Sequence, residues 1–73
     1  MPRYHFHVHD GRSSPDIHGT DMPDVHTAGI EAIRFAGEVL KDDAQRVSAH
    51  GSWRLEVTDD LGCVLFDMSF VIG

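Results

Sequence analysis

The sequence is poor in cysteine, and its 73 residues include only Cys63. A single cysteine cannot form a disulfide within the chain, and the lack of a C-x-x-C pair excludes a structural zinc site of the thiolate type. We therefore expect a free thiol at Cys63 and a reducing, cytoplasmic setting. Small domains without covalent cross-links often gain stability by self-association, so the length and composition favour a homodimer.

Positive charge is also scarce, since six Lys and Arg residues stand against twelve Asp and Glu residues and give a formal net charge of −6. Binding to nucleic acid or to an anionic membrane depends on clustered basic side chains, so we expect neither partner. Long hydrophobic runs are missing as well. No stretch approaches the ~20 apolar residues that cross a bilayer, and the first residues form no apolar leader. We expect a soluble, cytoplasmic protein.

The N-terminal half of the chain shows two kinds of periodicity. Alternating apolar and polar residues predict a strand over residues 3–9, and residues 17–22 are predicted as a short second strand. Apolar residues then recur at three- and four-residue spacing, which predicts one amphipathic helix over residues 24–48. Asp24 is suited to cap the start of this helix, and Gly51 follows its end.

Small residues line one side of this predicted helix. They are Ala28, Gly29, Ala32, Ala36 and Gly37. Each glycine costs about 1 kcal/mol relative to alanine in a helix interior, so a close contact is expected to compensate. Close packing of the helix on a sheet provides such a contact, and docking of a partner helix is the alternative.

The C-terminal part alternates again and predicts strands over 52–58 and 63–70, joined by a hairpin turn at 59–62. The residues predicted to face the helix are Tyr4, Phe6, Val8, Trp53, Leu55, Val57, Val64, Phe66, Met68 and Phe70. The residues predicted on the opposite, open face are His5, His7, His9, Arg54, Glu56, Thr58, Cys63, Leu65, Asp67 and Ser69.

These elements define the fold class. Their order is β-β-α-β-β, and they form one small domain over residues 1–73. We expect an α+β fold of two layers, with one helix packed on one face of a small mixed or antiparallel sheet. The other face of the sheet is polar and can meet water.

Three histidines, His5, His7 and His9, share the open face of the first predicted strand. Positions two apart on a strand are separated by about 6.6 Å, so neighbouring imidazoles can bind one metal ion, whereas all three can hardly share it. The candidate further ligands are Asp67, Glu56 and Cys63 from neighbouring strands, and His18 and His50 from loops. Zinc or another divalent transition metal suits these donors. The alternative is a solvated strand face without chemistry.

A hydrolase would need a nucleophile beside a histidine, with a third group to orient that histidine. Cys63, His7 and Asp67 can be written as such a set. The sequence shows no nucleophile-elbow motif and no oxyanion hole, and a domain with one helix has little room for a closed pocket. We therefore expect no enzyme.

Several short motifs together resemble a family of short bacterial proteins that is classed as a domain of unknown function. The motifs are Met-Pro-Arg-Tyr-x-Phe-His-Val-x-Asp-Gly (1–11), Asp16-x-x-Gly19, Met22-Pro23-Asp24 before an alanine-rich helix, and Trp53-x-Leu55-Glu56-Val57-x-Asp59-x-x-Gly62 with Phe70 near the end. The resemblance covers nearly the whole chain and implies no established activity, cofactor or catalytic residue. His7 fits the family's pattern, whereas position 5 there is more often aromatic and position 9 more often basic or variable.

Two functions remain open from the residues. The first is a small non-enzymatic protein-binding or regulatory module that forms a homodimer and has a protein partner. The second is a metal-binding protein that uses His5, His7 and His9 together with Asp67, without any other cofactor. A melting temperature that falls on addition of a chelator would distinguish the second function from the first.

Overall fold

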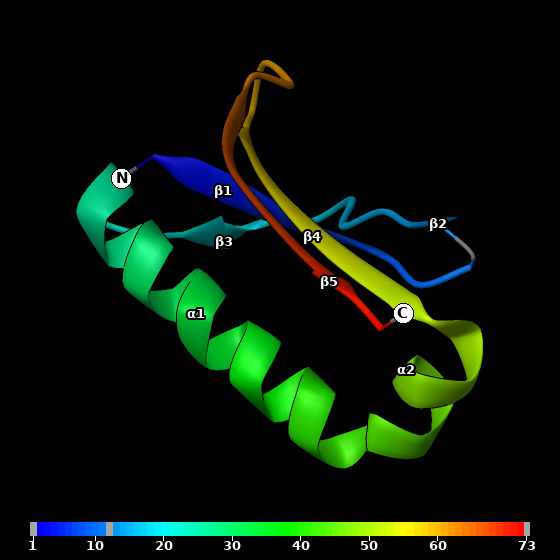
Figure 1. Cartoon of the computed structure of the whole chain (residues 1–73). Helices are drawn as coiled ribbons and strands as arrows, with labels where there is room; N and C mark the ends of the chain where they lie inside the picture. Colours follow the sequence, from blue (N-terminus) through cyan, green and yellow to red (C-terminus); the bar gives the residue numbers. More distant parts are fainter. Residues whose placement is uncertain (1, 12, 73) are drawn as a thin grey trace.

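A computed structural model describes residues 2–11 and 13–72. The elements in chain order are β1 (Arg3–His9), β2 (Ser13–Ser14), β3 (Thr20–Asp21), α1 (Val25–Asp42), α2 (Ala44–His50), β4 (Ser52–Asp59) and β5 (Val64–Val71). The strands form one antiparallel sheet, and the long helix α1 lies across one of its faces (Figure 1). The predicted α+β class and the approximate β-β-α-β-β order are confirmed. Neither helix in this part of the chain is long and apolar enough to cross a membrane.

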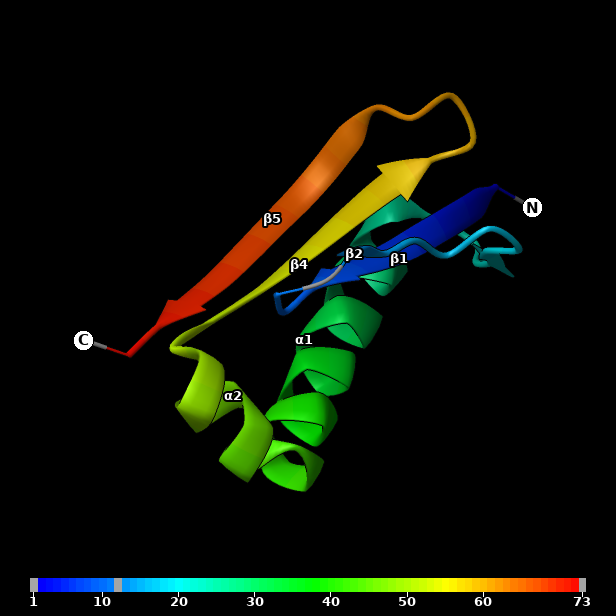
Figure 2. The ribbon, with the colours of Figure 1, turned by 90° about the vertical axis from the view of Figure 1, so that its right-hand side faces the viewer.

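The strands β1, β4 and β5 make up the body of the sheet, in the order β2-β1-β4-β5. The outer edge of β1 is covered by two short strands, because β2 pairs with its C-terminal end and β3 with its N-terminal end. The strand predicted over 17–22 is thus reduced to the two residues Thr20–Asp21. At the other side of the sheet, β5 forms an edge on which no strand of the described residues lies (Figure 2).

The prediction of one helix over residues 24–48 is wrong, because the structure has two helices that meet at Asp43. Asp24 caps α1 as predicted, since its carboxylate accepts a hydrogen bond of 2.8 Å from the N–H of Thr27. At Asp43 the backbone leaves the helical conformation, with φ −109° and ψ 27°. The chain then turns back toward β4 (Figure 1), so that Val47 of α2 joins the core at 4% exposure.

The hydrophobic core lies between the helices and the sheet. Trp53, Leu55 and Val57 of β4 are buried, as the alternation of that strand predicts. The remaining buried apolar residues are Tyr4, Met22, Ala28, Ala32, Ala36 and Val47. The three alanines lie at four-residue spacing, which places them on one face of α1. Their small side chains let α1 lie close to β4.

The two glycines inside α1 differ in their surroundings. A Cβ atom on Gly29 would lie 3.0 Å from Cζ of Phe66, whereas a Cβ atom on Gly37 would meet no atom within 4 Å. Close packing of the helix on the sheet therefore accounts for Gly29. It does not account for Gly37.

The side chains of β4 and β5 face the predicted sides of the sheet, except beside the turn that joins the two strands. The register of the pair shifts between Val57 and Thr58, which marks a β-bulge. Val64 therefore lies opposite Thr58 instead of facing the helix, and it is 53% exposed. Leu65, predicted on the open face, packs against the core, and Thr58, predicted to face water, is buried.

Candidate functional site

The three histidines of β1 share the open face of the sheet with polar residues of β4 and β5. The cross-strand pairs on this face are His5–Thr58, His7–Glu56, His9–Arg54 and Glu56–Asp67. Directly opposed residues point to the same side of a sheet, so the structure brings the predicted histidines together with Arg54, Glu56 and Asp67. Cys63, predicted for the same face, lies exposed in the turn before β5.

Asp16, in the loop between β2 and β3, organises two of these histidines. Its carboxylate accepts hydrogen bonds from the N–H groups of Phe6 at 3.1 Å and Gly19 at 3.0 Å. Its own backbone N–H donates to Nδ1 of His7 at 3.0 Å, and its carbonyl oxygen lies 2.8 Å from Nδ1 of His5. Although burial pulls the pKa of Asp16 upward, the N–H groups of Gly19 and Phe6 hold it below its ordinary value.

The hydrogen-bond partners indicate the tautomer of His7 and favour the charged form of His5. Nδ1 of His7 accepts a hydrogen bond, so its proton is on Nε2, which donates to Oγ1 of Thr58 at 3.0 Å. Both ring nitrogens of His5 face acceptors, namely the carbonyl oxygen of Asp16 and, at 2.8 Å, the carboxylate of Asp60. The hydrogen bond to Asp60, and after it the one to Asp16, raises the pKa of His5, so this geometry favours the imidazolium form.

His9 belongs to a separate network of polar side chains along the same face. Its Nε2 lies 3.1 Å from the carboxylate of Glu56, and its Nδ1 lies 3.1 Å from Oγ of Ser13. Arg54 joins Glu56 to Asp67, with two hydrogen bonds of 2.9 and 3.0 Å to the latter carboxylate. The hydrogen bond from Arg54 holds the pKa of Asp67 below its ordinary value.

Each candidate metal ligand on this face already has a protein partner. Both ring nitrogens of His5, His7 and His9 are hydrogen-bonded, and Asp67 is paired with Arg54. The rings of His5 and His7 are parallel, with centroids 6.0 Å apart. In residues 2–11 and 13–72, no group of three or more His, Cys, Asp or Glu side chains is arranged to hold a metal ion. A metal ion bound here would have to displace existing hydrogen bonds.

The hydrolase set is not assembled by hydrogen bonds. His7 binds Thr58 and Asp16, while Asp67 binds Arg54 from the far side of β4. Cys63 uses its backbone N–H to bind the carboxylate of the turn residue Asp59, and its thiol is exposed.

The second candidate site is the outer edge of β5. The N–H of Ile72 donates to the carbonyl of Gly51 at 2.8 Å, which fixes the alternation of hydrogen bonds between β4 and β5. By that alternation, the backbone N–H and C=O groups of Asp67, Ser69 and Val71 point away from β4. Among the described residues, no strand pairs with these groups.

Apolar side chains surround this edge. Phe70, Val71 and Ile72 at the end of β5 are at least half exposed. Strand edges are commonly protected by charged residues or proline, but the only charged residue of β5 is Asp67. Its carboxylate is bound to Arg54, on the open face. Within residues 2–11 and 13–72, the edge is therefore both unpaired and apolar at its C-terminal end.

The fold and its surfaces define a small α+β domain with a hydrogen-bonded histidine face, one covered sheet edge, and one edge that no strand of the described residues covers. The chain belongs to the DUF6894 family, a domain of unknown function, whose model matches residues 3–71. The family resemblance seen in the sequence motifs is thereby confirmed. No curated protein and no solved structure is significantly similar to the chain.

Proposed function

We propose that this chain is a non-enzymatic protein-binding module that binds through the edge of β5, and that the partner at this edge is a second copy. The observation that carries the proposal is the contrast between the two edges of the sheet. The edge of β1 is covered by β2, β3 and the side chain of Asp16. The edge of β5, eight residues long, has no such cover among the described residues.

A second copy suits this edge because antiparallel pairing of two β5 strands is symmetric about a two-fold axis. The register with Ser69 opposite its own copy sets Asp67 opposite Val71 of the partner subunit. It also avoids placing two Asp67 carboxylates against each other, which would be repulsive. On the helix side the same register sets Met68 opposite Phe70 of the partner subunit, a favourable pairing of a thioether with an aromatic ring.

The substitution Ser69→Pro tests this interface. Proline removes one outward N–H and is tolerated on edge strands where the N–H does not bond within the sheet. The chain has a mass of 8.1 kDa, and we expect light scattering after gel filtration to give twice this mass for the wild type and the single mass for Ser69→Pro.

The matched control is Ser69→Thr, which keeps the N–H and the strand preference and should remain dimeric. Circular dichroism checks that both variants stay folded. A monomeric wild type, or a folded Ser69→Pro that remains dimeric, would overturn the proposal.

A further inference from the structure

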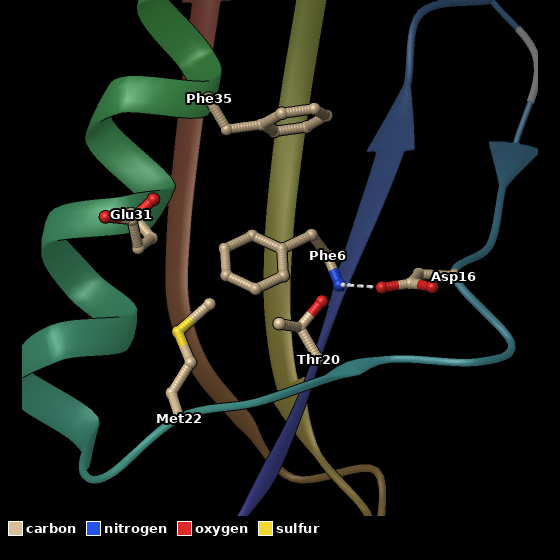
Figure 3. Close-up of a pocket in the computed structure, with 6 residues that line it drawn as sticks. All are labelled: Phe6, Asp16, Thr20, Met22, Glu31 and Phe35. Carbon is tan, nitrogen blue, oxygen red and sulfur yellow. Dashed lines mark hydrogen bonds between the residues drawn. The ribbon is translucent and has the colours of Figure 1, made fainter.

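A pocket of about 430 Å³ lies between α1 and the β1 side of the sheet. It is lined by Phe6, Asp16, Thr20, Met22, Glu31 and Phe35 (Figure 3). The central strand β4 separates β1 from β5, so this pocket is distinct from the free edge of the sheet. It shares Asp16 with the hydrogen-bonded histidines, whose side chains lie on the opposite face of β1.

The apolar part of the pocket is aromatic. The rings of Phe6 and Phe35 meet edge to face, with centroids 6.2 Å apart and planes at 73°. The thioether of Met22 lies beside Phe6 (Figure 3). Aromatic rings attract cations through the negative charge on their faces, in addition to burying apolar groups.

The polar part of the pocket is acidic. The described lining residues include Glu31 on α1 and Asp16 on the opposite loop, and none of these described residues is basic. The Asp16 carboxylate accepts hydrogen bonds from the backbone N–H groups of Phe6 and Gly19. Arg34 binds one oxygen of Glu31 at 2.8 Å, but its own side chain is 71% exposed and does not line the pocket. The pocket therefore combines aromatic surface with negative charge.

We propose that this pocket binds an ammonium or guanidinium group carried on an apolar chain, which can come from a lysine or arginine side chain of a protein or from a free organic amine. The apolar chain would lie against Phe6, Phe35 and Met22, and the cation would lie near the carboxylates of Glu31 and Asp16. The net charge of the chain, −6, favours cationic ligands over anionic ones.

The test uses n-butylammonium as the probe and n-butanol as its neutral counterpart, each titrated into ¹⁵N-labelled protein and followed by amide NMR shifts. We expect saturable shifts at the lining residues with the cation and weaker binding of the alcohol. Glu31→Gln, which keeps the size of the side chain, should weaken butylammonium binding about fivefold. The matched control is Glu38→Gln on the same helix, outside the pocket, which should leave binding unchanged.

A second pair of probes identifies the source of the cation. Blocked tripeptides Ala-Lys-Ala and Ala-norleucine-Ala are titrated in the same way. Tighter binding of the lysine peptide than of butylammonium assigns the pocket to a basic side chain of a protein, and equal binding assigns it to a free amine. Equal affinity for butylammonium and butanol, no shift with either, or an equal loss in Glu31→Gln and Glu38→Gln would overturn the proposal.

Discussion

The imidazole of His5 and the carboxylate of Asp60 lie 2.8 Å apart, although 55 positions separate them in the chain. The contact joins the middle of the sheet to the turn between β4 and β5. Because it raises the pKa of His5 in the folded protein, the charged imidazole stabilises the fold more than the neutral one does.

The stability of the fold should therefore depend on pH through His5. A raised pKa in the folded state means that this contribution is complete below the ordinary pKa of 6.5 and is lost as the pH rises through the folded-state pKa. We expect the free energy of unfolding, measured with urea at a series of pH values, to decline above pH 6.5. Asp60→Asn removes the largest cause of the shift and should flatten this decline. An equal decline in the variant and the wild type would contradict the prediction.

The open face illustrates what the sequence could predict about this site. Alternation in β1 and β4 placed His5, His7, Arg54 and Glu56 on one face correctly, because a strand has a strict period of two. The role of Asp16 was missed, since it depends on how a loop folds back on β1. The spacing Asp16-x-x-Gly19 was the available signal, because an aspartate side chain often binds a nearby backbone N–H in turns.

The fold class could also be predicted from the periodicity of strands and helices. The errors in this prediction have local causes. The β-bulge beside Thr58 reversed the expected orientations of Val64 and Leu65, and a single extra residue in a strand leaves no mark on the hydrophobic pattern. The break at Asp43 was hidden because Val47 continues the helical spacing of α1. The free edge of β5 could not be foreseen, since alternation gives the faces of strands and not their order.

Zinc should bind weakly or not at all at the histidine face. Binding would require a ring nitrogen of His5, His7 or His9 to give up its present partner, and Asp67 to leave Arg54. We expect calorimetric titration of chelator-stripped protein to show no stoichiometric binding at submicromolar affinity, and the melting temperature to be unchanged by chelator. His7→Ala is the comparison variant. Tight binding by the wild type that is lost in His7→Ala would contradict this prediction and support the metal-binding alternative.

The glycines of α1 offer a matched pair of substitutions. Glycine to alanine inside a helix stabilises by about 1 kcal/mol when the new methyl group has room. Gly37→Ala has that room, whereas the methyl group of Gly29→Ala would meet Phe66 at 3.0 Å. We expect urea unfolding to show a gain for Gly37→Ala and a smaller gain, or a loss, for Gly29→Ala. Equal gains would show that the ring of Phe66 moves aside without penalty.

The indole N–H of Trp53 is a buried donor for which no hydrogen-bond acceptor is found among the described residues. Its side chain is 1% exposed, and within the described part of the chain Nε1 has no acceptor. A buried donor without a partner costs about 1–3 kcal/mol, so replacing the indole by a phenyl ring removes this penalty while it also removes packing volume. These two effects oppose each other in Trp53→Phe.

We therefore expect Trp53→Phe to destabilise the fold by less than about 1 kcal/mol, compared with the 2–5 kcal/mol typical of a large-to-small change such as Leu55→Ala. Leu55 is a well-matched reference for Trp53 because both residues lie on the same face of β4 and are fully buried. Unfolding must be followed by circular dichroism, because Trp53 is the only tryptophan in the sequence and its fluorescence is lost in the variant. If Trp53→Phe costs as much as Leu55→Ala, the indole N–H has a partner in solution and its burial carries no penalty.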